Sequence, residues 1–149
     1  MVFRAISIAV LAASFSLCIK SNFMHSRKRA ISEAFLLSDS VHNLTPDNFN
    51  NSALENPLPV VVDFYAGWCP SCPQMNNYFS EICAENSNLY CAAYDFDNDE
   101  AIPARYGADV LPAFRFFCKG EEDESRRIDG ALPEEQLERD ILDFLEKCD

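Results

Sequence analysis

The feature that most constrains this chain is the stretch Val60–Cys72, an apolar run that ends at two cysteines separated by two residues. Its first part, Val60–Tyr65, is rich in β-branched and aromatic residues, which is typical of a strand buried on both faces. Cys69-Pro70-Ser71-Cys72 then has the pattern of a helix start. A strand, two thiols and a helix in this order indicate redox chemistry.

The spacing of the two cysteines predicts how they would react. If Cys69 caps the helix and Pro70 lies in its first turn, the Cys69 sulfur lies beside unpaired backbone N–H groups that stabilise a thiolate. Cys72 returns to the same face one turn later, within reach of a disulfide. We therefore predict an exposed nucleophile at Cys69, a sheltered thiol at Cys72 and a redox-active disulfide between them.

Other uses of a cysteine pair have less support. A zinc or iron–sulfur site needs further ligands, but the remaining cysteines are single and both histidines lie outside the expected core. We therefore expect neither a metal nor another cofactor. A permanently oxidised structural disulfide stays open as an alternative, although closing a two-residue loop stabilises little.

Four further cysteines belong to the predicted folded part. Cys83, Cys91 and Cys118 fall in predicted helix or strand positions, where cysteine is usually a small buried hydrophobe. Cys148, one residue from the C-terminus, is the best candidate for an exposed regulatory thiol.

Charge is distributed unevenly along the 149 residues. Residues 1–32 carry five of the twelve Lys and Arg residues and none of the 24 acidic ones, so the remainder is strongly acidic. Such a body has no basic face to neutralise phosphates, which argues against nucleic acid as a partner. The hydrophobic content, 48%, is enough for one ordinary core, so we expect one domain and an appendage.

The appendage has the pattern of a targeting leader. Residues 1–20 contain a fifteen-residue apolar run, too short for a bilayer span of about 20 residues but suited to a secretory signal. Residues 21–37 form a basic, transit-like or linker segment, and residues 38–149 form the folded domain. We predict the secretory pathway (endoplasmic reticulum lumen or secreted). The alternatives are an uncleaved anchor, a plastid reached through a two-part leader, or a mitochondrion.

Periodicity and turn residues predict an alternating α/β order. The acidic run Glu121–Glu124 is expected to be a solvated loop within a hairpin. The order predicts a three-layer α/β/α sandwich with a mixed central sheet. Strands are expected at 41–44, 58–65, 89–96, 114–118 and 125–129, and helices at 45–54, 70–86, 100–106 and 133–147.

Several motifs resemble those of the thioredoxin family, over roughly residues 38–148. Val61–Cys72 is similar to the family's active-site strand and helix start, including the tryptophan before the first cysteine. Tyr106–Phe114 resembles the second signature, whose proline is cis and faces the cysteines. Lys119-Gly120 and Gly130-Ala131 match the later turn glycines. The resemblance implies the thioredoxin fold and a thiol–disulfide oxidoreductase that acts on protein disulfides.

The resemblance also implies roles for single residues. Cys69 would attack a substrate disulfide and Cys72 would resolve the mixed disulfide, while Asp63 beneath them would accept the Cys72 proton. Pro112 and the residue before it would receive an extended substrate strand. The docking surface that the resemblance implies consists of Trp68, Gly67, Leu111, Pro112, Gly130 and Ala131.

Departures from the family pattern concern the direction of electron flow. Pro70-Ser71 replaces the usual Gly-Pro, Pro73 replaces a basic residue, Asn77 replaces a kinking proline and Ala93 replaces a lysine near the buried acid. The leading hypothesis is a monomeric reductase of protein disulfides that a separate reductase regenerates. The second is an oxidase or isomerase of the secretory pathway that an oxidase regenerates. The third is a redox-silent binding module.

Overall fold

The computed structural model describes residues 39–148. The predicted signal in residues 1–20, the basic segment 21–37 and the domain start at residue 38 lie outside the described residues. Within residues 39–148, none of the helices combines the length and the apolar character that crossing a membrane requires.

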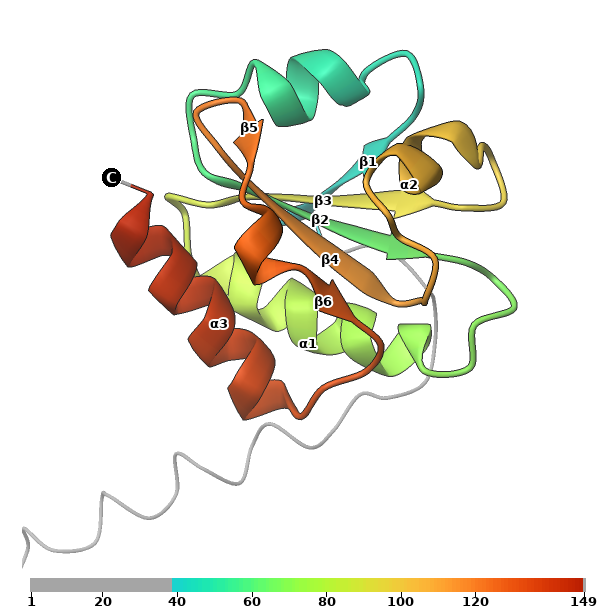
Figure 1. The fold of residues 1–149 in the computed structure, drawn as a ribbon. Helices are drawn as coiled ribbons and strands as arrows, with labels where there is room; N and C mark the ends of the chain where they lie inside the picture. The colour runs from blue at the N-terminus through green and yellow to red at the C-terminus, as the bar shows by residue number, and fades with distance from the viewer. Residues whose placement is uncertain (1–38, 149) are drawn as a thin grey trace, which may run out of the picture. The chain divides into compact units, whose positions relative to one another are not determined.

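Eleven short elements alternate along the described chain, in the order that the periodicity predicts up to β4 (Figure 1). Their bounds are β1 (Val41–Leu44), η1 (Asn50–Leu54), β2 (Val60–Tyr65), α1 (Cys72–Glu85), β3 (Tyr90–Asp95), α2 (Ala101–Arg105), β4 (Ala113–Cys118), β5 (Glu121–Glu122), η2 (Glu124–Arg126), β6 (Ile128–Asp129) and α3 (Glu134–Lys147).

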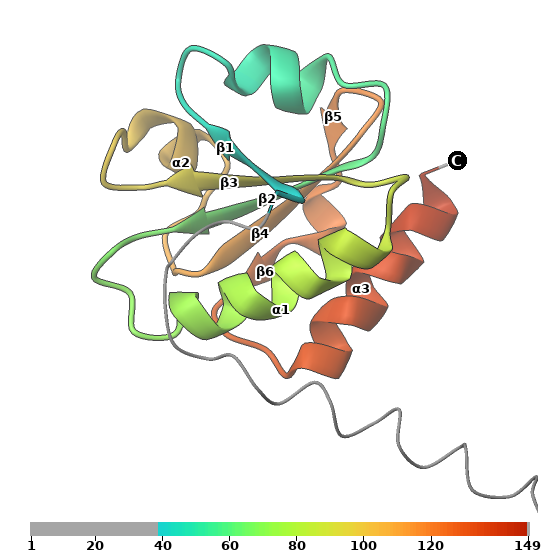
Figure 2. The ribbon, with the colours of Figure 1, turned by 180° about the vertical axis from the view of Figure 1, so that it is seen from behind.

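The strands form one mixed sheet in the order β1-β3-β2-β4-β5, with β6 also paired to β4. β1, β3 and β2 run parallel, and β4 runs antiparallel to β2. Helices α1 and α3 cover one face, while η1 and α2 cover the other (Figures 1 and 2). The predicted three-layer α/β/α sandwich with a mixed sheet is therefore confirmed.

Each face of the sheet has its own core. The core beneath α1 and α3 contains Cys69, Cys72 and apolar residues of both helices. The opposite core is aromatic: Phe49, just before η1, stacks with Tyr106 and meets the edge of Phe117. Each fully buried aromatic ring contributes about 1.5–3 kcal/mol of transfer free energy, so β2 is held firmly from both sides.

Two predicted elements are shorter than expected. The helix predicted from residue 45 is reduced to a single π-type turn, η1. The reason is local, because the Asn48 side chain accepts a hydrogen bond from the Thr45 backbone N–H and stabilises a turn there. The short α2 ends as predicted, with Gly107 at a positive φ of 62° directly after it.

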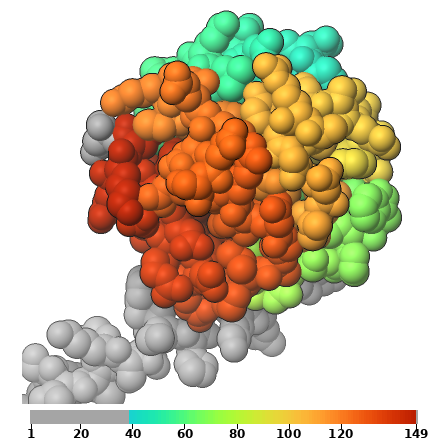
Figure 3. Space-filling view, viewed as in Figure 1, coloured from blue at the N-terminus to red at the C-terminus, as the bar shows by residue number. Residues whose placement is uncertain are grey.

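The predicted loop Glu121–Glu124 and strand 125–129 are wrong in detail. Glu121–Glu122 forms β5 and pairs with the end of β4, Glu124–Arg126 is a 3₁₀ turn, and only Ile128–Asp129 pairs as β6. Glu122 is drawn into the fold because Arg127 binds its carboxylate through two hydrogen bonds of 2.7 and 2.8 Å. In the space-filling view this segment (orange) lies between α3 (red) and the α2 region (amber) (Figure 3).

Candidate redox site

The two cysteines of the motif are joined as a disulfide at the carboxyl end of β2. Their Cα atoms are 5.5 Å apart, and Cys69 lies in the loop between β2 and α1. In this oxidised form Cys69 is 4% exposed and Cys72 is 1% exposed. The expectation of an exposed Cys69 is therefore wrong for the disulfide state, because the sulfurs pack into the core beneath α1 and α3.

Helix α1 begins at Cys72, with Ser71 as its N-cap, rather than at Pro70 as predicted. Pro73 explains the later start, since it has no N–H to donate to the Cys69 carbonyl. At the start of α1 the Met75 N–H donates to the Ser71 carbonyl, at 3.2 Å. Cys69 consequently precedes the helix instead of capping it.

Asp63 lies at the centre of β2 and is 1% exposed. Burial raises the pKa of its carboxyl group from 3.8 to about 8. One carboxyl oxygen, Oδ1, is buried and has no hydrogen-bond partner among the described residues. A carboxyl group with a pKa near neutrality and an unused oxygen can take up and release a proton at physiological pH.

Sequence reasoning missed Asn76, a polar residue of α1 that is only 8% exposed. When its amide nitrogen faces the two neighbouring acceptors, it donates to Asp63 Oδ2 at 2.5 Å and to the Cys72 carbonyl at 3.1 Å. The signal was present in the sequence, because Asn76 is four residues after Cys72 and three before Phe79, on the face that points to the core.

Trp68 stands out from this end of the molecule, with 65% of its surface exposed. Its indole N–H donates to Asp97 Oδ1 at 2.8 Å, and the Gly67 N–H donates to the other oxygen of the same carboxylate at 3.2 Å. Asp97 was not predicted as a site residue. From its turn after β3, Asp97 holds Gly67 and Trp68, the two residues that precede Cys69.

The second predicted docking segment is Leu111–Pro112, and its backbone has the expected conformation. The Leu111–Pro112 peptide bond is cis. The Gly130 N–H donates to the Pro112 carbonyl at 2.8 Å, which joins the two predicted docking segments, while Ala131 is exposed beside it. Gly130 has a φ of 89°, a conformation that favours glycine.

The remaining cysteines of the described chain are joined in disulfides, a bonding that the expectation of small buried hydrophobes at Cys83, Cys91 and Cys118 did not include. Cys83 near the end of α1 is bonded to Cys91 in β3, and Cys118 at the end of β4 is bonded to Cys148 after α3. Cys148 is buried, so it is not an exposed regulatory thiol. The sequence could not pair them because each bond joins elements that meet only across the core.

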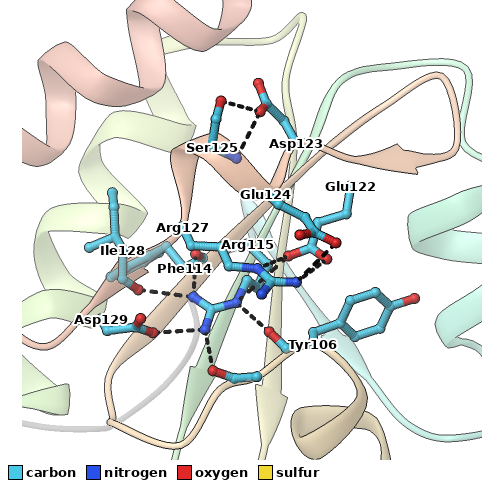
Figure 4. Close-up of polar contacts among 11 residues, drawn as sticks. Tyr106, Phe114, Arg115, Glu122, Asp123, Glu124, Ser125, Arg127, Ile128 and Asp129 are labelled. Atoms are coloured by element: carbon cyan, nitrogen blue, oxygen red, sulfur yellow. Dashed lines mark hydrogen bonds and ion pairs between the residues drawn. The ribbon is translucent and has the colours of Figure 1, made fainter.

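A second buried charge lies on the opposite face of the sheet, at Arg115 of β4. Its five N–H groups make five hydrogen bonds, four of them to backbone carbonyls and one to the Asp129 carboxylate at 2.7 Å (Figure 4). The carbonyls belong to Tyr106, Gly107, Phe114 and Ile128. A lone basic residue inside an apolar strand was the available signal.

Comparison with known proteins agrees with this geometry. The thioredoxin family model matches residues 40–143. The chain belongs to the thioredoxin family. It is 31% identical to thioredoxin of Rickettsia typhi over 108 residues, covering 72% of this chain and 97% of the relative. It is 30% identical to thioredoxin of Porphyra purpurea over 107 residues, covering 71% and 98%.

A third relative extends over more of the chain. The protein named Thioredoxin M-type, chloroplastic, of Spinacia oleracea is 30% identical over 145 residues, which is 96% of this chain and 78% of the relative. Membership of this family, together with the Cys69–Cys72 bond, makes the protein a thiol–disulfide oxidoreductase with the thioredoxin fold. Among residues 39–148, no three His, Cys, Asp or Glu side chains gather as a metal site would require.

Proposed function

We propose that this protein reduces disulfide bonds of protein substrates through the Cys69/Cys72 dithiol. The observation that carries the proposal is the buried Asp63, whose Oδ1 has no partner among the described residues, on the strand that leads to a cysteine pair joined as a disulfide. The proposal assigns Cys69, Cys72 and Asp63 to catalysis.

The reaction balances in two exchange steps. The Cys69 thiolate attacks one sulfur of the substrate disulfide, forming a mixed disulfide and releasing the other substrate sulfur as a thiolate. Cys72 then loses its proton to Asp63 and attacks Cys69, which closes the Cys69–Cys72 disulfide and releases the second substrate sulfur. Two electrons have passed to the substrate, and a separate reductase must return two electrons to the protein.

Docking is assigned to the surface around the cysteines. An extended substrate strand would pair with the backbone at Leu111 and Pro112, and apolar substrate side chains would contact the exposed Trp68. Gly67, Gly130 and Ala131 would keep the rest of this surface flat, since none has a side chain larger than a methyl group.

Asp63 also supports a reductase over an isomerase. Disulfide isomerases, which the Phe64-Tyr65-Ala66 segment otherwise resembles, usually carry a glutamate at this position and a histidine between the cysteines. Here the intervening residues are Pro70 and Ser71, neither of which is titratable.

A second candidate function, oxidase or isomerase of the secretory pathway, has its own support in the two further disulfides. Cys83–Cys91 and Cys118–Cys148 are of the kind that persists in oxidising compartments, because cytosolic reductants keep such thiols reduced. In such a compartment an oxidase would regenerate the Cys69–Cys72 disulfide.

The equilibrium potential of the Cys69/Cys72 couple against glutathione separates the two functions. A potential near about −270 mV, with rapid reduction of insulin, supports the reductase, whereas about −180 to −120 mV overturns it in favour of the oxidase. The variant C72S should trap mixed disulfides on Cys69. C83A/C91A is the matched control, since it removes a different cysteine pair and should trap nothing.

The proposed location is the secretory pathway, with residues 1–20 as a signal, 21–37 as a linker or transit segment and 38–149 as a monomeric domain. The two further disulfides support an oxidising lumen. A plastid is the alternative, supported by the chloroplastic spinach relative. Mass spectrometry of the mature N-terminus tests both: a start near residue 20 supports a secretory signal alone, and one near residue 38 supports a two-part leader.

A further inference from the structure

Asn76 is the buried polar side chain of the redox site to which neither the sequence motifs nor the family match assigns a role. It projects from α1 into the core beneath the sheet, one helical turn after Cys72. Burying an amide in apolar surroundings costs free energy unless its hydrogen bonds are made. The contacts of this amide therefore indicate what it does.

Both N–H bonds of the Asn76 amide are directed at the redox site. One is donated to the backbone carbonyl of Cys72 at 3.1 Å, and the other to Asp63 Oδ2 at 2.5 Å. Oδ2 is thereby occupied, whereas Oδ1 of the same carboxyl group has no partner among the described residues. The amide distinguishes the two oxygens of Asp63 and ties one of them to the residue that carries the resolving thiol.

Few other groups are available to stabilise the Asp63 carboxylate. Its register partners are Ala93 on β3 and Phe114 on β4, whose side chains donate no hydrogen bond. The titratable groups that face it are Tyr65, two residues along β2, and the Cys69 and Cys72 thiols when the site is reduced. α3 packs this core with apolar side chains. Burial acts on the carboxyl group without an opposing charge.

We propose that Asn76 is a positioning residue of the redox reaction: its amide holds Asp63 against the backbone of Cys72 and leaves Oδ1 as the oxygen that receives the Cys72 proton. This inference rests on the proposed role of Asp63 in resolving the mixed disulfide. A neutral donor stabilises the carboxylate without neutralising it, so the proton can be accepted and later released.

The balance of the step shows why the donor matters. During resolution the S–H bond of Cys72 breaks, the proton moves to Asp63, and the Cys72 sulfur forms a bond to Cys69 as the substrate sulfur leaves. Only the ionised form of Asp63 can accept the proton. Loss of the Asn76 donor makes that form less favourable and raises the pH at which it appears.

The variant N76L tests the inference, because leucine has the same branched shape as asparagine but no donor. The first measurement is the pH titration of the Asp63 carboxyl carbon by NMR, in the full-length oxidised chain labelled with ¹³C-aspartate. D63N identifies the resonance. Removing one hydrogen bond to a charged group should raise the titration midpoint by about one pH unit.

Two further variants control for packing and position. N77L makes the same change at the adjacent exposed residue of α1 and should leave the midpoint unchanged. N76A should raise the midpoint less than N76L, because water can enter the smaller side chain's space and donate in place of the amide. N76A also serves if N76L does not fold.

Kinetics supply the second measurement. A midpoint that is higher by about one pH unit leaves about one tenth as much Asp63 ionised wherever the pH lies below both midpoints. Insulin reduction by N76L should then be about tenfold slower at pH 7, where proton transfer limits the rate, and approach the wild-type rate above about pH 9. In a D63N background N76L should have no further effect.

The outcomes separate this inference from the proposed function. A wild-type protein that fails to reduce insulin, but whose Asp63 midpoint rises in N76L and not in N77L, overturns the reductase and supports the positioning role. An unchanged midpoint in N76L and N76A overturns the positioning role while leaving the reductase intact. If N76L slows insulin reduction equally in the wild-type and D63N backgrounds, the positioning role is also overturned, since the effect would not pass through the Asp63 carboxyl group.

Discussion

Asp63 and Arg115 are both buried charged residues on neighbouring central strands, yet their surroundings are opposite. Arg115 uses all five of its N–H groups in hydrogen bonds. Asp63 has one amide donor at Oδ2 and none at Oδ1. They also face opposite layers, because the chain neighbours of Asp63, Val62 and Phe64, belong to the aromatic core, whereas those of Arg115 belong to the cysteine-containing core.

The difference between the two residues separates structure from chemistry. A buried charge whose every atom is satisfied keeps its protonation state and fixes the strands around it. A buried charge with an unpaired atom destabilises the fold in its ionised form, and its pKa moves toward neutrality. The first arrangement suits a structural anchor, and the second suits a residue that exchanges protons.

The largest effect is expected for R115M, which keeps a long side chain but removes every donor. Four backbone carbonyls and Asp129 lose their partner, and the backbone acceptors cannot be replaced by apolar groups. The free energy of unfolding should fall by about 5 kcal/mol, measured by guanidinium unfolding with the disulfides intact. R105M, at an exposed arginine of α2, should change it by less than about 1 kcal/mol.

The second effect has the opposite sign, since D63N should stabilise the protein. The folded pKa of Asp63 is raised, so its contribution to stability is fully present below the unfolded value of 3.8 and is lost as the pH rises towards about 8. D63N should therefore gain little at pH 4 and roughly 4 kcal/mol at pH 7.

Unfolding curves at pH 4, 6 and 8 check this prediction for D63N. D47N, at an exposed aspartate, is the matched control and should give the same gain or loss at each pH. A D63N gain that is equal at pH 4 and pH 8 would contradict the assignment of the raised pKa to Asp63.

The smallest effect is expected for D129N. The Asp129 side chain is 46% exposed, so its ion pair with Arg115 at 2.7 Å is screened by solvent. An amide oxygen can still accept the hydrogen bond, and the cost should be about 0.5 kcal/mol. A loss approaching that of R115M would show that Arg115 is held by its ion pair rather than by the backbone carbonyls.

Much of the redox site is readable from local sequence patterns. The continuous apolar run around Asp63 places a carboxyl group inside a buried strand, and the two-residue spacing of Cys69 and Cys72 brings their sulfurs within bonding reach. The helix start was predicted two residues too early, at Pro70, because the N–H that Pro73 lacks was not given enough weight. Each of these signals acts within a few residues along the chain.

Contacts between residues of different layers could not be predicted from such local patterns. Cys148 was expected to be an exposed thiol and is instead bonded to Cys118, thirty residues away. Asn76 was not predicted as a site residue, because its spacing along the helix indicates only that it faces the core. It does not indicate that Asp63 lies opposite. Asp97 holds Gly67 and Trp68 from a turn thirty residues further along the chain.

The sequence by itself determined the alternation of strands and helices, the cysteine pair at the end of β2 and the burial of Asp63, because periodicity and turn chemistry act over short distances. Only the tertiary structure decided which groups meet Asp63 and Arg115. Asp63 receives a single amide, because packing brings α1 beneath β2. Arg115 receives a complete set of acceptors, because packing brings strand β6 and the turn after α2 against β4. That difference in partners makes one charge reactive and the other structural.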